Sequence, residues 1–140
     1  MRVFEAYRKF VTYRNTINKI EPMFLELRKA VPMSELQFNN IYVCVLEAFN
    51  NAIIHGNRLN NSRFVEMYLY VEDNIVFIDI IDEGNGFDET ILPNPLDPEN
   101  IIKDNGRGIF IIDCLCSKKT YKKNQRGFTV SMEFDLSCEE

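Results

Sequence analysis

Apolar and polar residues alternate along much of the chain with the period of two that is typical of strands. Residues 3–13 alternate loosely and are rich in Val, Phe and Tyr, and residues 64–72 alternate more regularly. Residues 75–81 are almost all apolar, which predicts a strand at the centre of a sheet. Two shorter strands are expected over 118–122 and 128–136, on either side of a turn.

A helical period replaces this alternation in the region between the first two strands. A first helix is expected over residues 16–30, where Pro22 falls early enough to be tolerated. Residues 31–33 then break it. Its inner side is expected to carry Ile17, Ile20, Phe24, Leu25 and Leu27.

The second helix has signals at both of its ends. Ser34 and Gln37 have the spacing of a capping box, so the helix begins after Ser34. It is expected to run to about His55, with Gly56 as its C-terminal cap. The stripe that faces the core consists of Ile41, Val45, Ala48 and Ala52. A second stripe, which we expect to be the site face, consists of Asn40, Cys44, Glu47 and Asn51.

The order of these elements predicts the fold class. A long polar segment over 82–105 leads into a third helix over 109–116, and loops of that length are usually functional lids or disordered. An α+β fold best fits this order, which is strand, helix, helix, strand, strand, loop, helix, strand, strand. In its two layers, helices cover one face of a mixed, mainly antiparallel sheet. A chain of 140 residues fits one domain, residues 1–140.

Charge and composition exclude several classes of partner. The net charge of -5 and the pI of about 5.0 argue against direct binding of nucleic acid or of acidic membranes, which need a basic surface. No apolar stretch approaches the roughly 20 residues of a membrane span, and the N-terminal residues lack a signal-peptide core. The expected location is therefore cytoplasmic.

The cysteines do not predict a metal or redox site. Cys114 and Cys116 lack the C-x-x-C spacing of such sites, and the only histidine, His55, is far from them in sequence. Cys44 and Cys138 stand alone. All four are best interpreted as small buried hydrophobes in a reducing compartment.

A first candidate site comes from the second helix. Glu47 and Asn51 are four residues apart, so their side chains point the same way from an otherwise apolar helix. The carbonyl oxygen of an asparagine can bind Mg²⁺, and a nearby carboxylate can accept a proton from a hydroxyl group or a water molecule. The pair therefore suggests a nucleotide site.

A second candidate is the segment 82–87, which directly follows the central strand. Asp82 could accept a hydrogen bond from an exocyclic amine such as that of adenine. Gly84 and Gly86 would let the backbone approach a ligand closely. An ordinary turn is the alternative, because Asp, Gly and Asn are common turn formers.

A third candidate is the junction between the long loop and the third helix. Unpaired N–H groups and the helix dipole favour phosphate binding at such a helix start, and Arg107 adds a cationic donor. Gly106 and Gly108 flank it, preceded by Asp104 and Asn105. The spacing fits neither a Walker loop nor a Rossmann fingerprint, and an ordinary helix start is the alternative.

Taken in this order, the three motifs resemble the N box and the two glycine boxes of the GHKL ATPase superfamily. This superfamily includes DNA gyrase, histidine kinases and MutL-type ATPases. The wording around Glu47–Gly56, and the stretch from Pro93 through 97–100 into 106–110, resemble its small stand-alone branch, the bacterial anti-sigma factor serine/threonine kinases. The resemblance covers roughly Ser34 to Val130 and implies a Bergerat-type ATP-binding fold.

The resemblance also implies a role for each candidate residue. Glu47 would act as general base, Asn51 would bind Mg²⁺, and Asp82 would bind the adenine amine in a pocket shaped by Gly84 and Gly86. Residues 89–105 would form a mobile lid. The segment that wraps the phosphates of ATP or ADP would consist of Asn105, Gly106, Arg107 and Gly108.

The chain departs from the superfamily near its end. Members often have Gly-Thr there, and the threonine helps to bind adenine through water. Here Phe128 follows Gly127, and Thr129 comes one place later. A shift of one residue in a strand moves a side chain to the opposite face, so Phe128 could pack against the base instead. We nevertheless include Thr129 among the candidate nucleotide-binding residues.

Two functions of different classes follow from this resemblance. The first is a kinase that uses Mg-ATP to phosphorylate a STAS-type anti-sigma factor antagonist and that, as a homodimer, sequesters a sigma factor. The second is a non-catalytic nucleotide-binding module that only sequesters a regulatory protein. A detached histidine-kinase catalytic domain is a third interpretation, although the chain contains no dimerisation helices with a phospho-acceptor histidine. Function inferred from resemblance remains analogy.

Overall fold

The computed structural model describes residues 2–84, 117–125 and 127–137. Within these ranges it contains five strands that form one sheet in the order β1-β2-β3-β5-β4, with every neighbouring pair antiparallel. The strands are β1 (Arg2–Val11), β2 (Phe64–Glu72), β3 (Ile75–Asp82), β4 (Lys118–Lys123) and β5 (Phe128–Asp135). All five predicted strands are thus confirmed to within two residues at either end, and β3 is central as expected. The predicted helix over 109–116 and most of the polar segment lie outside the described residues.

The first predicted helix is two separate elements. A 3-10 helix, η1 (Arg14–Lys19), precedes α1 (Glu21–Ala30), and Ile20 lies between them. Pro22 explains the division, because proline is accommodated in the first turn of a helix but not in its interior. The expected inner side is also corrected at Leu25, which is 46% exposed, whereas Met23 is buried.

The second predicted helix begins as expected. The side chain of Ser34 accepts a hydrogen bond from the backbone N–H of Gln37 (3.0 Å), and the Gln37 side chain accepts one from the backbone N–H of Ser34 (2.9 Å). This confirms the capping box at the start of α2 (Glu35–Asn51). The predicted core stripe of α2 is confirmed as well, because its four residues are all buried.

The end of the second helix differs from the prediction. After Asn51 the α-helix widens into a π-helical turn, η2 (Ala52–Gly56), whose C-terminal cap is Asn57. Gly56 is therefore inside this turn and is not a left-handed cap; the positive φ angles belong to Arg58 and Leu59 instead. No helix within the described ranges has both the length and the apolar composition needed to cross a membrane.

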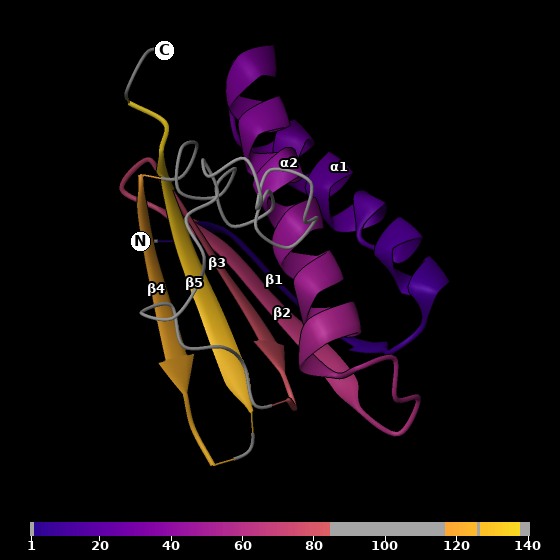
Figure 1. The fold of residues 1–140 in the computed structure, drawn as a ribbon. Helices are drawn as coiled ribbons and strands as arrows, with labels where there is room; N and C mark the ends of the chain where they lie inside the picture. The colour runs from indigo at the N-terminus through magenta and orange to yellow at the C-terminus, as the bar shows by residue number, and fades with distance from the viewer. Residues whose placement is uncertain (1, 85–116, 126, 138–140) are drawn as a thin grey trace, which may run out of the picture.

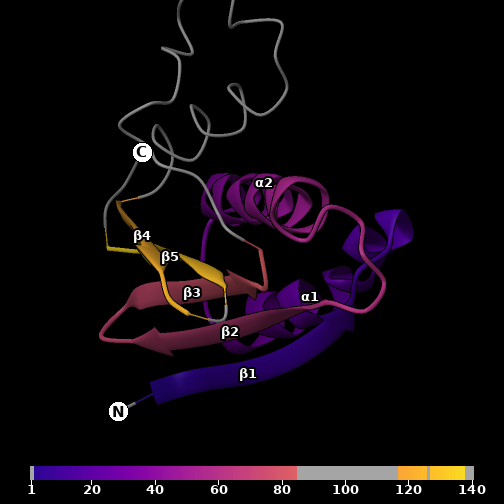
Figure 2. The same cartoon turned by 60° about the horizontal axis from the view of Figure 1, so that its bottom comes forward.

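The helices and the sheet form two layers (Figure 1). The three inner strands β2, β3 and β5 each have one buried face, as on β2, where alternate side chains from Val65 to Val71 are fully covered. Figure 2, turned by 60°, shows α2 lying across the sheet above β2 and β3. The core between the layers is one continuous cluster of buried side chains, with Phe24 of α1 and Phe49 of α2 among its largest members. The site at the end of β3 is held against this core.

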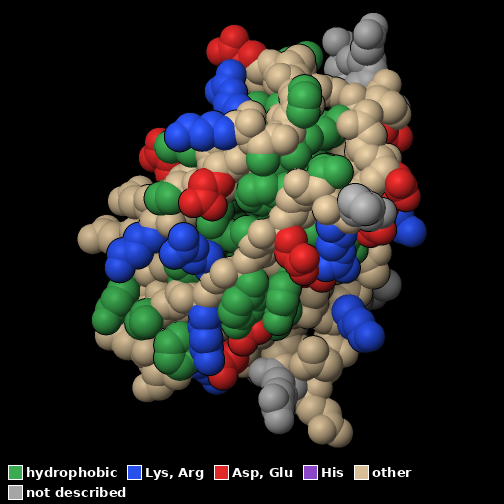
Figure 3. Space-filling model, turned by 180° about the vertical axis from the view of Figure 1, so that it is seen from behind, with side chains coloured by type: hydrophobic (Ala, Val, Ile, Leu, Met, Phe, Trp, Pro, Cys, Tyr) green, Lys and Arg blue, Asp and Glu red, His purple; other side chains and the backbone are tan. Residues whose placement is uncertain are grey.

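The opposite face of the sheet, which we call the outer face, is not covered by α1 or α2. Figure 3 shows this side of the molecule, where hydrophobic side chains gather among acidic and basic ones. Tyr7 of β1 and Tyr68 of β2 are directly paired, with ring centroids 4.5 Å apart, and are 47% and 43% exposed. Next to them Tyr70 stacks on Phe77 of β3 at 4.6 Å.

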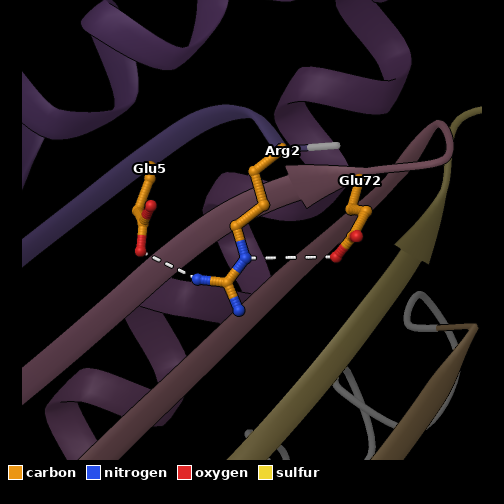
Figure 4. A network of polar contacts seen from close by, with 3 residues as sticks. All are labelled: Arg2, Glu5 and Glu72. Carbon is orange, nitrogen blue, oxygen red and sulfur yellow. Dashed lines mark hydrogen bonds and ion pairs between the residues drawn. The ribbon is translucent and has the colours of Figure 1, made fainter.

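Charged residues frame this aromatic surface at the start of β1. Figure 4 shows Arg2 between two carboxylates, 2.8 Å from Glu5 and 3.9 Å from Glu72. The same guanidinium group lies 3.9 Å above the centre of the Tyr70 ring. The outer face of β1 and β2 therefore combines exposed aromatic rings with charges of both signs.

Candidate functional site

Asp82 is the buried carboxylate of the candidate site. It is the last residue of β3, on the face that the helices cover, and only 5% of it is exposed. Its Oδ1 atom accepts a hydrogen bond from the backbone N–H of Gly84 at 2.8 Å. Burial raises the pKa of Asp82 from 3.8 to about 6, although the Gly84 hydrogen bond and the charge of Arg63 act in the opposite direction. A carboxylate kept this dry is available to a ligand that can donate a hydrogen bond.

Three glycines pack closely around this aspartate. A side chain at Gly56 would occupy the position of the Asp82 carboxylate, and one at Gly84 would overlap the backbone carbonyl of Gly56. A side chain at Gly127 would overlap the backbone carbonyl of Asp82. The start of the second predicted motif is thus in direct contact with the end of the first. Gly56 and Asp82, which meet there, are 26 residues apart along the chain.

Asn57 connects the same segment to the rest of the fold. Its side chain is fully buried, and its Oδ1 atom accepts a hydrogen bond from the backbone N–H of Glu83 at 2.8 Å. Its Nδ2 atom donates to Thr12 Oγ1 (2.9 Å) and to the carbonyl of Phe64 (3.0 Å). The sequence analysis assigned no role to Asn57. The only signal was an asparagine directly after a helix-ending glycine, a pattern that also suits an ordinary turn.

Glu47 and Asn51 lie on successive turns of α2, as their spacing predicts, and both are half-buried. Asn51 is the last residue of α2, so its side chain leaves the helix immediately before η2. The π-helical turn η2 packs against β3 and brings the chain from Asn51 to the carboxylate of Asp82 within five residues. Such turns occur frequently at functional sites.

The side chain of Asn51 fits a role as a magnesium ligand. It offers one neutral carbonyl oxygen, and Mg²⁺ commonly takes few protein ligands and completes its shell with substrate phosphates and water. Within the described ranges, no group of three His, Cys, Asp or Glu residues could hold a metal ion on its own.

The register of β5 decides which side chain lies beside Asp82. Phe128 pairs with Asp82 and is buried on the helix-covered face, where it stacks on Tyr121 with ring centroids 6.0 Å apart. Thr129 pairs with Ile81, one residue on, so it lies on the outer face. The structure therefore brings Phe128 rather than Thr129 next to the aspartate, and the site described below leaves Thr129 out.

Five of the candidate residues cannot be placed. Gly86, Asn105, Gly106, Arg107 and Gly108 lie outside the described residues, as does the predicted lid over 89–105. The candidate residues that the structure describes in this region are Glu47, Asn51, Asp82 and Gly84, and Gly56, Asn57 and Phe128 are neighbours of the Asp82–Gly84 segment.

An open cavity of about 570 Å³ lies on the outer side of the same strand ends. Its lining includes Lys9, Phe64, Glu66, Ile81 and Glu83, and it also reaches Asp82 and Gly127. Of these, Ile81 precedes Asp82 in the strand, so its side chain points to the opposite face from the aspartate. The cavity therefore borders Asp82, although Lys9, Phe64 and Glu66 place most of it on the outer face.

Comparison with known proteins agrees with this geometry. The family model of the histidine kinase-like ATPase domain matches residues 14–134. The serine-protein kinase RsbW of Staphylococcus aureus is 31% identical over an alignment of 97 residues that covers 64% of this chain and 60% of that protein. The chain therefore covers less than two thirds of the length of these curated relatives.

Solved structures show the same fold at low sequence identity. The RsbU and RsbW domains of Rv1364c from Mycobacterium tuberculosis match with a TM-score of 0.65 and 13% identity, over 95% of this chain and 32% of that one. The histidine kinase domain of the blue-light activated kinase from Erythrobacter litoralis EL346 matches with a TM-score of 0.58 and 17% identity, over 87% and 60%. These likenesses confirm the predicted two-layer α+β architecture.

Proposed function

This chain belongs to the histidine kinase-like ATPase domain family, and from that premise we propose that it binds Mg-ATP and phosphorylates a protein serine or threonine. The observation that carries the proposal is the buried carboxylate of Asp82, held by Gly84 and Gly56 beside the end of α2. Family membership supports ATP as the ligand. The similarity to serine-protein kinase RsbW supports phosphoryl transfer to a hydroxyl group.

Asp82 is suited to recognise adenine. A carboxylate accepts hydrogen bonds and donates none, so it favours a base with an exocyclic amine over one with a carbonyl at that position. Because Asp82 is only 5% exposed, water competes weakly for its oxygen atoms. Phe128, paired with Asp82 in the sheet, supplies an apolar surface next to the carboxylate on which a base could pack.

Glu47 and Asn51 supply the groups needed for phosphoryl transfer. We propose that Asn51 would hold a Mg²⁺ ion, which would supply charge neutralisation for the transferred phosphoryl group. The carboxylate of Glu47 orients the acceptor hydroxyl and takes its proton. The hydroxyl oxygen then forms a bond to the γ-phosphorus while the bond to the β,γ-bridging oxygen breaks, and ADP leaves. Asn105, Gly106, Arg107 and Gly108 are proposed to wrap the phosphates.

The partners are proposed from the relatives. The kinase would phosphorylate a STAS-type anti-sigma factor antagonist and would hold a sigma factor when that antagonist is phosphorylated, in both cases as a homodimer in the cytoplasm. The similarity to RsbW supports this assignment over 97 residues. The exposed aromatic rings on the outer face, at Tyr7 and Tyr68, offer a surface for the dimer.

One observation favours a second function, a nucleotide-binding module that sequesters a regulatory protein without phosphorylating it. Phe128 occupies the helix-covered position beside Asp82, and Thr129 is turned to the outer face. A phenyl ring is larger than a threonine side chain and offers no hydrogen bond to water near the base. The pocket could therefore bind nucleotide too weakly to support turnover.

Calorimetric titration with Mg-ATP and Mg-ADP is the first test. We expect Kd values of about 1–100 μM, corresponding to roughly -8 to -5.5 kcal/mol. Asp82→Asn should abolish the heat of binding, because a side-chain amide can present a donor to the adenine amine. Absence of binding by the wild-type protein would contradict the proposal and leave the sequestering module as the better explanation.

Phosphate transfer to the antagonist separates the two functions. Glu47→Gln keeps the size of the side chain but removes the base, so we expect transfer to fall by about 10²–10⁴-fold while Mg-ATP binding stays within a factor of about three. Glu35→Gln changes the same charge at the exposed start of the same helix and should leave transfer unchanged. Equal loss of binding and transfer in Glu47→Gln would rule out the general-base role.

A further inference from the structure

We propose that Asn57 is a positioning residue that orients the Asp82–Gly84 segment for recognition of the adenine amine. The inference rests on the proposed function and adds to it a residue outside the three predicted motifs. Asn57 does not need to touch the nucleotide. It acts by fixing the peptide group between Asp82, which would contact the nucleotide, and Glu83.

The hydrogen bonds of the Asn57 side chain define its orientation. Its Oδ1 atom accepts from the backbone N–H of Glu83, and both hydrogens of Nδ2 have acceptors in Thr12 Oγ1 and the carbonyl of Phe64. The group is fully buried, so water does not replace any of these three bonds. A carboxamide is the only uncharged side-chain group with two N–H donors and a carbonyl acceptor.

Thr12 anchors this arrangement to the sheet. It is fully buried just beyond the end of β1, and its hydroxyl donates to the carbonyl of Arg63 at 2.7 Å. The same hydroxyl oxygen accepts from Asn57, so its single hydrogen and one lone pair are both in use. The network thus joins the end of β1, the start of β2 and the end of β3 around one side chain.

The network acts on Asp82 through two consecutive peptide groups. Asn57 fixes the N–H of Glu83, and Asp82 itself receives the N–H of Gly84. A second bond fixes Glu83 from the outer side, where its carboxylate accepts from the backbone N–H of Phe64. Gly56, the residue before Asn57, is in contact with the carboxylate of Asp82. Loss of the Asn57 carboxamide would therefore free the peptide that sets the direction of that carboxylate.

Discrimination between ATP and inosine triphosphate tests this role. Inosine has a carbonyl oxygen where adenine has its amine, so the ratio of the two Kd values reports how well Asp82 is aimed. In Asn57→Ala we expect the preference for ATP to fall at least about tenfold, or 1.4 kcal/mol. A residue that only stabilises the fold would lower the melting temperature and leave the ratio unchanged, since the measurement is made on the folded protein well below that temperature.

Two sets of controls accompany this variant. Thr12→Val removes the anchor of the network and should also reduce the preference for ATP, whereas Thr12→Ser keeps the hydroxyl and should retain it. Asn60→Ala removes a carboxamide from the same loop. Among the described residues, the Asn60 side chain accepts one hydrogen bond, from the backbone N–H of Ser62 at 2.9 Å, so this variant should have no effect. These two pairs separate the hydrogen-bond network from a general effect of substitution in the loop.

The outcomes distinguish this inference from the proposed function. Failure of the wild-type protein to prefer ATP over inosine triphosphate would contradict recognition of adenine by Asp82, and the positioning role with it. A wild-type preference that Asn57→Ala and Thr12→Val both retain would overturn only the positioning role. Should Asn57→Ala fail to fold, Thr12→Val gives the same test.

Discussion

Asp82 shows at the scale of one residue how binding and stability conflict. Its burial would serve the proposed recognition of adenine, because a dry carboxylate binds a donor strongly, but the same burial disfavours its charged form. Since the folded-state pKa is about 6 and the ordinary value is 3.8, the folded protein binds this proton more tightly than the unfolded chain does. The stabilising contribution is complete below about pH 4 and is lost as the pH rises through 6.

Replacement of this one carboxylate should therefore stabilise the unliganded protein. Asparagine keeps the acceptor for the Gly84 N–H but carries no charge. We expect Asp82→Asn to raise the free energy of unfolding by about 1–2 kcal/mol at pH 7.5, and by much less at pH 4.5. Urea denaturation of both proteins across this pH range measures the difference. A gap that does not widen as the pH rises would show that Asp82 is not destabilised by burial.

Single residues were predicted from the sequence to very different degrees. That Glu47 and Asn51 share a face could be predicted from their spacing alone, because a helix fixes which side chains point the same way. Asn57 could not, because its three partners come from positions 12, 64 and 83, and only the fold brings these together. The position of Phe128 beside Asp82 likewise depends on the register between β3 and β5, which is set by pairing across the sheet.

At the scale of elements, the candidate site lies at the junction of α2, η2 and β3. The periodicity of α2 predicted its core stripe, and the capping box predicted its start. The π-helical turn was not predicted, since the sequence indicated a continuous helix to about His55; the turn Ala52–Gly56 packs against β3, which only the fold shows. The same packing explains Gly56: it is required by the close approach to Asp82, and not by a left-handed backbone.

A methyl group at Gly56 tests this junction. In Gly56→Ala the added carbon would meet the Asp82 carboxylate, so either the carboxylate or the end of β3 must move. We expect a loss of about 1–3 kcal/mol in stability and a fall of at least about tenfold in Mg-ATP affinity. His55→Ala alters the neighbouring exposed side chain of the same turn and should change neither. Normal affinity in Gly56→Ala would show that the contact does not matter for binding.

At the scale of the whole molecule, the two faces of the sheet have different tasks. The inner face holds the core and the site, whereas the outer face of β1 and β2 exposes paired aromatic rings among charges of both signs. In a two-fold symmetric dimer each patch contacts its own copy, so a surface that mixes positive and negative groups can be complementary to itself. This arrangement supports the proposed homodimer and leaves the site of each subunit on the far side of the sheet.

A single charge on the outer face should therefore dissociate the dimer. Tyr68 lies opposite Tyr7 and is 43% exposed, so Tyr68→Glu disturbs the folded monomer little but places a carboxylate in each half of the contact. Buried hydrogen-bonded or aromatic anchors commonly contribute about 2 kcal/mol or more to binding, so we expect the dissociation constant measured by sedimentation to rise at least about thirtyfold.

Leu36→Glu is the matched control. It adds the same charge at an exposed leucine of α2, on the opposite layer, and should leave the dimer intact. Dissociation by Leu36→Glu and not by Tyr68→Glu would assign the contact to the helical layer. Because the outer face is separated from Asp82 by the sheet, monomeric Tyr68→Glu should still bind Mg-ATP with the affinity of the wild-type protein.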